Sequence, residues 1–209
     1  MLYIIYGATR ETGYKIREYF KEHNYQIIKK YCYKKDDNVY NRAVHNNQPL
    51  QELLTLWHND WISVHSAEEI KEYDYWYHVN NELFFGFNTE QIIDAVQNKT
   101  NAIITVVSST MEFVKKLKKQ FGEKVKVLFL YSDTPAYVDE SGYKGVLSTS
   151  IFITIMNEYY VPKETYINDI SCFDTALIYA GRNKTFGFSS LILQIESFIK
   201  KQNLTGVCL

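Results

Sequence analysis

The chain has 209 residues, of which 23 are Lys or Arg and 24 are Asp or Glu, so its formal net charge is −1. This length suits one α/β domain with insertions and is enough to bury a substantial core. A charge so close to zero gives no electrostatic reason to expect a nucleic-acid or membrane partner. No stretch has the pattern of a secretory leader or a membrane span, so we expect a cytoplasmic protein.

The first thirty residues predict a strand, a glycine-bounded loop and a helix. Residues 3–6 form an apolar run, and residues 12–23 place Ile16, Tyr19 and Phe20 on one helical face. In α/β proteins the amides of such a loop and the N-terminus of the helix favour an anion. The candidate phosphate- or nucleotide-binding residues are therefore Gly7, Ala8, Thr9, Arg10, Glu11, Thr12 and Gly13.

This loop departs from both established phosphate-binding patterns. Aligned on G-x-x-x-x-G-K-[ST], Gly7 takes the first glycine, but Thr12 takes the second and Gly13 the lysine. The G-x-G-x-x-G pattern of dinucleotide folds is not met either, although the loop is similar to the G-A-T-G-x-x-G of atypical short-chain dehydrogenases. The chemistry of the loop is therefore altered, and Arg10 and Lys15 are the candidate catalytic replacements for the missing charge.

The elements expected next interrupt the alternation of strands and helices. They are a strand over 25–31, a polar loop over 34–48, a helix opened by Pro49, a short helix capped by Ser66 within 66–69, a hairpin of 73–79 with 83–87, and a helix capped by Thr89.

The second half returns to alternating strands and helices. It predicts a buried strand over 102–107, a helix opened by a capping box at 109–112, a strand over 125–131, a loop over 133–145, a helix over 148–160, a strand over 176–180 and a last helix from Ser189 to Lys200.

Apolar strands alternating with helices predict a doubly wound parallel sheet of about five strands, covered by helices on both faces. Strand 3–6 should be interior, with Gly7 at its carboxyl end. We expect one domain: a core of residues 1–31, 88–131 and 161–209, a hairpin-bearing lobe of 32–87 and a lid-like segment of 132–160.

At this point the chain resembles a guanylate kinase, a P-loop nucleoside monophosphate kinase. The stretch ELFFGFNTEQIIDAV over 82–96, with the strands and helix that follow, is similar to the family's Tyr-Gly-Thr/Ser turn and its next elements. CFDTALI over 172–178 resembles the family's closing F-D-x-x-[IV] strand. The resemblance implies a guanylate-kinase-like fold, with ATP and Mg²⁺ as cofactors if the kinase activity is present.

Carried over by position, the resemblance places the monophosphate-binding lobe on Lys34, Asp74, Phe85 and Gly86. Lys34 lies near the family's first arginine and Asp74 near its base-reading acid. Phe85 stands for the tyrosine of the Tyr-Gly-Thr/Ser turn and lacks its hydroxyl. Thr105 and Val107 replace the two aspartates of the middle strand, so several charged groups of the mechanism are missing.

Three interpretations remain open. The first is a nucleotide- or anion-binding protein with kinase activity lost or much reduced; it takes a nucleotide or small phosphate ligand and is compatible with a protein partner. The second is an active nucleotide kinase with a rebuilt phosphate loop. The third is a small NAD(P)-binding reductase, supported by Tyr159-x-x-x-Lys163 but opposed by Pro162 between them. The three cysteines and five histidines have no ligand spacing, so no metal site is expected.

Overall fold

The computed structural model describes residues 1–8, 10–35, 61–80, 83–98, 100–106, 111–131, 173–178 and 188–205. In chain order its elements are β1 (Leu2–Tyr6), α1 (Arg10–Glu22), β2 (Gln26–Ile27), β3 (Lys30–Lys34), β4 (Trp61–Ser63), α4 (Ala67–Lys71), β5 (Trp76–Asn80), β6 (Leu83–Phe87), α5 (Thr89–Gln97), β7 (Ala102–Val106), α6 (Glu112–Phe121), η1 (Gly122–Lys124), β8 (Val125–Tyr131), β9 (Thr175–Ile178) and α8 (Phe188–Thr205).

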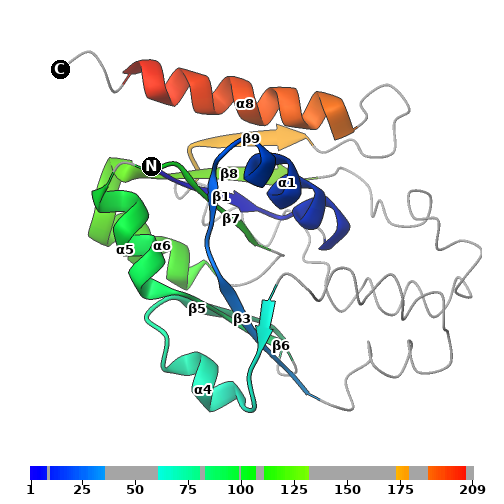
Figure 1. The fold of residues 1–209 in the computed structure, drawn as a ribbon, viewed down its shortest axis with the longest axis vertical. Helices are drawn as coiled ribbons and strands as arrows, with labels where there is room; N and C mark the ends of the chain where they lie inside the picture. Colours follow the sequence, from blue (N-terminus) through cyan, green and yellow to red (C-terminus); the bar gives the residue numbers. More distant parts are fainter. Residues whose placement is uncertain are drawn as a thin grey trace, which may run out of the picture.

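The core is a parallel sheet in the order β2-β7-β1-β8-β9 (Figure 1). β1 lies between β7 and β8, and all five of its residues are buried. A strand with neighbours on both sides and helices on both faces must be apolar throughout, which explains the unbroken run Leu2–Tyr6. The predicted parallel α/β sheet and the interior position of its first strand are confirmed.

Alternate residues of β1 face opposite sides of the sheet, and two of the described helices cover each side. Tyr3 and Ile5 pack with α1 and α8, including Ile16 and Ile195. Leu2, Ile4 and Tyr6 lie on the other side with α5 and α6. Figure 1 shows α8 along the upper side of the sheet and α5 with α6 on the opposite side.

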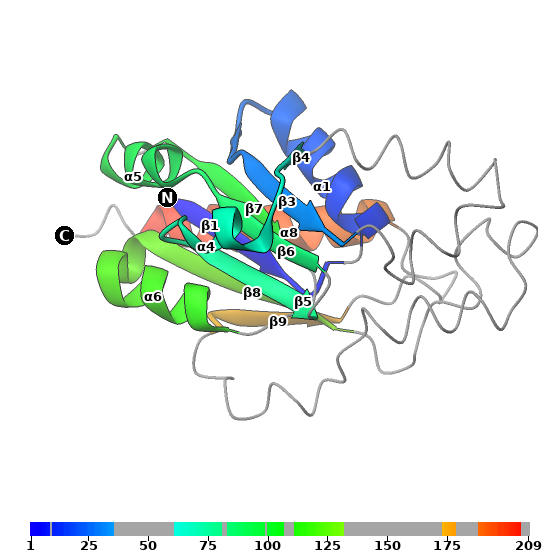
Figure 2. The ribbon, with the colours of Figure 1, turned by 90° about the horizontal axis from the view of Figure 1, so that it is seen from below.

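A second sheet, in the order β4-β3-β6-β5, forms a lobe next to the core sheet. β5 and β6 pair antiparallel as the predicted hairpin, and β3 pairs antiparallel with β6. The inner face of the lobe belongs to the same buried cluster as α5 and α6, while Ile70 of α4 is buried against its outer face. Seen from below, the lobe strands lie across the core sheet (Figure 2).

The single strand expected over 25–31 is wrong, because the chain changes sheet within it. Ile28 still donates its amide to Ile103 of the core sheet, at 3.4 Å. Lys29 instead accepts from the amide of Asn88, and from Lys30 onward the chain pairs with β6 and β4. Apolar periodicity measures burial but not the identity of the neighbouring strand, so the sequence pattern did not contain this switch.

The residues predicted to cap the helices agree only in part with the caps in the structure. Ser66 caps α4 as predicted, because its Oγ accepts from the Glu69 amide at 3.1 Å. The cap of α5 is Asn88 rather than Thr89, since the Asn88 side chain accepts from the Gln91 amide at 2.7 Å. α6 begins at Glu112, after Met111, which makes no side-chain cap. Ser109 and Thr110 of the box expected at 109–112 lie outside the described residues.

Some further differences concern element ends. α1 begins at Arg10 rather than residue 12, and Ser189 lies inside α8 rather than capping it. The helix expected from Pro49, the loop over 133–145, the helix over 148–160 and the lid-like segment 132–160 lie outside the described residues.

Candidate functional site

The turn after β1 is tied to both neighbouring strands. Gly7 has a φ of +83°, and a Cβ on it would lie 2.2 Å from the carbonyl oxygen of Leu130, so a glycine is required there. The amides of Gly7 and Ala8 both donate to the Val106 carbonyl, at 2.9 and 3.1 Å. An anion at this loop would therefore be held by residues after Ala8. Thr9 lies outside the described residues.

The turn occupies the topological switch point of the sheet. After β1 the chain enters α1 on one face, and after the adjacent β7 it enters α6 on the other face. In open α/β sheets, ligands bind outside the carboxyl ends of strands whose connections leave in opposite directions. The carboxyl ends of β1 and β7 are thus the place to examine for a binding site.

Gly13 packs directly against β7. A Cβ at this position would lie 3.4 Å from the Thr105 hydroxyl and 3.2 Å from Nη1 of Arg17. Position 13 therefore faces the sheet at close range, in the interior of the protein. The residue that aligns with the P-loop lysine therefore has no side chain here.

Two buried cations meet at Thr105, and neither is among the site residues predicted from the sequence. Arg17 is 8% exposed, Lys30 6% and Thr105 3%. Nη1 of Arg17 donates to the Thr105 hydroxyl, and Nζ of Lys30 lies 3.5 Å from the Thr105 carbonyl oxygen. A signal existed for Arg17, because it shares the sheet-facing side of α1 with Gly13, Ile16 and Phe20, where an apolar residue is expected.

The other predicted loop residues lie around the first turns of α1. Arg10, Glu11 and Thr12 form its first turn, at the helix N-terminus. Lys15 is exposed, because it lies on the side of α1 away from Gly13. The structure therefore brings Gly7 and Gly13 to the carboxyl ends of β1 and β7, while Lys15 points to the outside of α1.

The predicted lobe residues are spread over both sides of the second sheet. Phe85 is 1% exposed, and Nζ of Lys30 lies 4.9 Å from the centroid of the Phe85 ring. Gly86 faces the opposite side, where a Cβ would lie 2.7 Å from the Tyr73 ring. Lys34 is half-buried at the end of β3, and Asp74 is exposed in an ion pair. Lys34 is on the same face of β3 as Lys30, opposite Leu83 of β6, and Phe85 is the residue of this set that contacts Lys30.

The aromatic residues of β6 form part of a packed core. Phe85 has its ring centroid 5.0 Å from that of Tyr77 and 5.6 Å from that of Trp61. Phe87 lies 5.6 Å from Phe113 of α6. These rings join the lobe to the helices of the core, so they serve as packing side chains of the hairpin.

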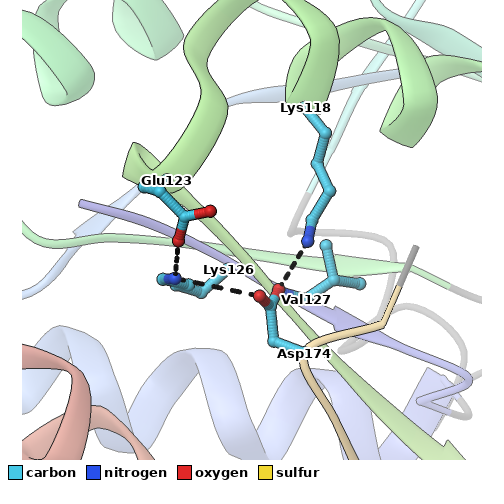
Figure 3. A network of polar contacts seen from close by, with 5 residues as sticks. All are labelled: Lys118, Glu123, Lys126, Val127 and Asp174. Carbon is cyan, nitrogen blue, oxygen red and sulfur yellow. Dashed lines mark hydrogen bonds and ion pairs between the residues drawn. The ribbon is translucent and has the colours of Figure 1, made fainter. Parts of the chain in front are cut away.

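A polar network holds the start of β9 against β8 (Figure 3). The Asp174 carboxylate accepts from the Val127 amide at 2.6 Å and from Lys118 at 2.8 Å, and Lys126 lies 3.8 Å away. Lys126 also donates to Glu123, and that hydrogen bond lowers the pKa of the Glu123 carboxyl. This aspartate belongs to the CFDTALI stretch, and its contacts give it a role in positioning β9.

The described residues contain no group of three or more His, Cys, Asp or Glu side chains arranged to hold a metal ion. None of the helices formed by these residues combines the length and the apolar character needed to cross a bilayer.

Comparison with protein-family models gives no match, and comparison with curated proteins gives none. Among solved structures, guanylate kinase from Anaplasma phagocytophilum is similar with a TM-score of 0.45 and 12% identity, over 94% of this chain and 85% of that chain. A gluconokinase from Sinorhizobium meliloti 1021 is similar with a TM-score of 0.34 and 10% identity, over 96% of both chains. Function therefore has to be argued from the site itself.

Proposed function

We propose that the chain is a guanylate-kinase-like protein that binds a nucleotide or a small phosphate ligand at the carboxyl ends of β1 and β7, with kinase activity lost or much reduced. Two things support the proposal: the resemblance of the sequence to guanylate kinases, and the position of the turn at the switch point of the sheet. We also propose that Gly7–Gly13 is a degenerate phosphate loop, because it leads into a helix N-terminus but has no lysine.

One observation is the main support for the proposed loss of kinase activity. Where the resemblance expects a lysine and an aspartate, the chain has Gly13 and Thr105, packed against each other with 3.4 Å between a Cβ at position 13 and the Thr105 hydroxyl. A glycine at this position offers no side chain that could reach a phosphate. Phosphoryl transfer depends on positioning and charge neutralisation by Lys, Arg and Mg²⁺, so losing these groups removes most of the mechanism.

Folding and ligand binding require fewer of the charged groups than catalysis does. The strand, the Gly7 turn and α1 are held by backbone hydrogen bonds to Val106 and by apolar packing, which do not involve the lost groups. A helix N-terminus next to a turn can bind an anion through its amides alone. Binding can therefore persist in a chain whose transfer chemistry has gone.

An active kinase with a rebuilt phosphate loop is the second candidate, and the buried cations Arg17 and Lys30 favour it. In that case ATP and Mg²⁺ are its cofactors, and the charge of the loop lysine is supplied from elsewhere. The two candidates share a ligand and differ in turnover, so an ADP-release assay separates them.

A thermal-shift panel of GMP, dGMP, ATP, GTP and NADPH tests the binding function. A specific ligand at 100 times its dissociation constant stabilises the folded chain by about 2.7 kcal/mol. We expect a saturable rise in melting temperature with at least one nucleotide. A rise with NADPH alone would favour the reductase interpretation, and no rise with any of the five would contradict nucleotide binding.

A further inference from the structure

In the part of the chain that the structure describes, the lobe is joined to the core by two crossings that lie side by side. Lys29 leads into β3, and Asn88 leads from β6 into α5. The Asn88 amide donates to the Lys29 carbonyl at 3.1 Å, and the Lys29 amide donates to Oε1 of Gln91 at 2.7 Å. Two neighbouring crossings can act as a hinge between two bodies. The contacts of the lobe beyond these crossings therefore decide whether it can move.

The helix α6 supplies such contacts, because it touches both sheets. It packs against β8 of the core sheet and against β5 of the lobe, and Figure 1 shows it between the two. The side chain of Phe113, in the first turn of α6, is 3% exposed. Its ring is stacked on that of Tyr77 in β5, with 5.3 Å between the centroids, and lies 5.6 Å from the ring of Phe87 in β6. One side chain of the core thus contacts both strands of the lobe hairpin.

Polar contacts further along α6 hold the lobe at a second place. The Tyr75 hydroxyl donates to Oε1 of Gln120 at 2.6 Å, and Nζ of Lys116 donates to the Asp74 carbonyl at 2.8 Å. Phe113 and Gln120 lie two turns apart on the helix, about 10 Å along its axis. Movement of the lobe relative to α6 would have to break the contacts at both places.

The inner face of the lobe is also part of the main hydrophobic core. Leu83, Phe85 and Phe87 of β6 are each 1% exposed, and they belong to the buried cluster that contains Tyr6 and Val106 of the core sheet. Exposing one side chain of this size to water lowers the population of an opened state by about tenfold to a hundredfold. Exposing two of them leaves an opened state at about one part in a hundred or less.

We propose that α6 holds the lobe fixed against the core sheet, with Phe113 as the main contact. The two sheets then move as one body, and the lobe does not close over the carboxyl ends of β1 and β7. This inference concerns the fold and goes beyond the proposed function. Its consequence for the site is that a ligand at these strand ends meets a site that is already formed.

Double electron–electron resonance on the full chain tests this inference. One spin label is attached at Glu72 of the lobe and one at Ser197 of α8, both exposed, through unnatural amino acids that leave the native cysteines unchanged. Distances are measured for the chain alone and with GMP, ATP and Mg²⁺. The variant is Phe113→Ala. The matched control is Phe20→Ala, which removes a ring that is 1% exposed from the buried cluster on the opposite face of the core sheet.

We expect one narrow distance distribution for the wild type, with a mean that shifts by less than about 2 Å when the nucleotides are added. Phe113→Ala should broaden or split this distribution, whereas Phe20→Ala should leave it unchanged, although both variants lose a buried ring. Circular dichroism establishes that each variant is folded. If Phe113→Ala does not fold, Phe113→Leu removes the ring contacts and keeps an apolar side chain, and it should broaden the distribution less strongly.

The wild-type measurement alone can overturn the inference. Two distance populations without ligand, or a shift above about 2 Å with nucleotide, would show that the lobe moves as a separate body. A wild-type distribution retained in the folded Phe113 variant would contradict the role of that residue. Equal broadening in Phe20→Ala would contradict it as well, because the effect would then follow from a general loss of stability.

Discussion

The Asp174 network gives the sharpest stability prediction. Asp174→Asn keeps the shape of the side chain and one acceptor for the Val127 amide, but it removes the negative charge that faces Lys118 and Lys126. The side chains of Asp174, Lys118 and Lys126 are 19%, 26% and 11% exposed, so water screens the pairs only in part.

The expected loss follows from these contacts. A hydrogen bond to a charged group contributes about 1.5–3 kcal/mol, and partial exposure places this one in the lower half, at about 2 kcal/mol. For a chain of this size, 1 kcal/mol shifts the melting temperature by about 2–4 °C, so we expect a decrease of about 4–8 °C.

Asp74→Asn is the matched control for this substitution. Asp74 pairs with Lys116 at 3.7 Å, and the two side chains are 61% and 53% exposed. Exposed pairs contribute about 0–1 kcal/mol, so this variant should melt within about 4 °C of the wild type. Thermal melting followed by circular dichroism measures both. Equal melting temperatures for the two variants would refute the assignment of Asp174 as the residue that anchors β9.

Three further predictions follow from the backbone and the core. Gly7→Ala should destabilise the chain more than Gly122→Ala, because both have positive φ but only Gly7 has a carbonyl at 2.2 Å from the new Cβ; chemical denaturation measures the difference, and equal losses would contradict the close contact. Asn88→Ala should destabilise by about 1 kcal/mol through loss of the α5 cap, whereas Thr89→Ala should change stability less. Burial, with a smaller contribution from Tyr25, raises the Tyr3 pKa from 10.0 to about 12, so the stability due to its neutral form is present below pH 10 and is lost as pH rises toward 12. Urea titrations of Tyr3→Phe across this range should show a smaller pH dependence than the wild type, and an unchanged dependence would contradict the raised pKa.

The parts of the fold that the sequence predicted are those in which a local pattern has one structural outcome. Leu2–Tyr6 is apolar without interruption, which fits an interior parallel strand, and Gly7 ends it with a backbone conformation that favours glycine. The aromatic runs before and after residues 81–82 pair as a hairpin because neighbouring strands find each other with little loop entropy.

The parts that could not be predicted depend on long-range contacts. The change of sheet at Ile28 and Lys29 is set by Ile103 and Asn88, more than 50 residues away in the chain. Lys30 reaches Thr105 because of that change, so its place at the candidate site could not be read from the lysine-rich run around it. Arg17 was detectable as a charge on an apolar helical face, but its partner Thr105 was not.

A coupled assay of ADP release, with ATP, Mg²⁺ and GMP or dGMP, tests most directly whether the kinase chemistry has been lost. Gly13 and Thr105 stand where the resemblance expects charged groups, and each missing group of this type costs about 2.7–4 kcal/mol of transition-state stabilisation. Two such losses reduce the rates of about 1–100 per second usual for kinases by about 10⁴-fold or more. We expect turnover below about 0.01 per second in a preparation that still binds nucleotide. Turnover above about one per second with either substrate would contradict the loss of activity.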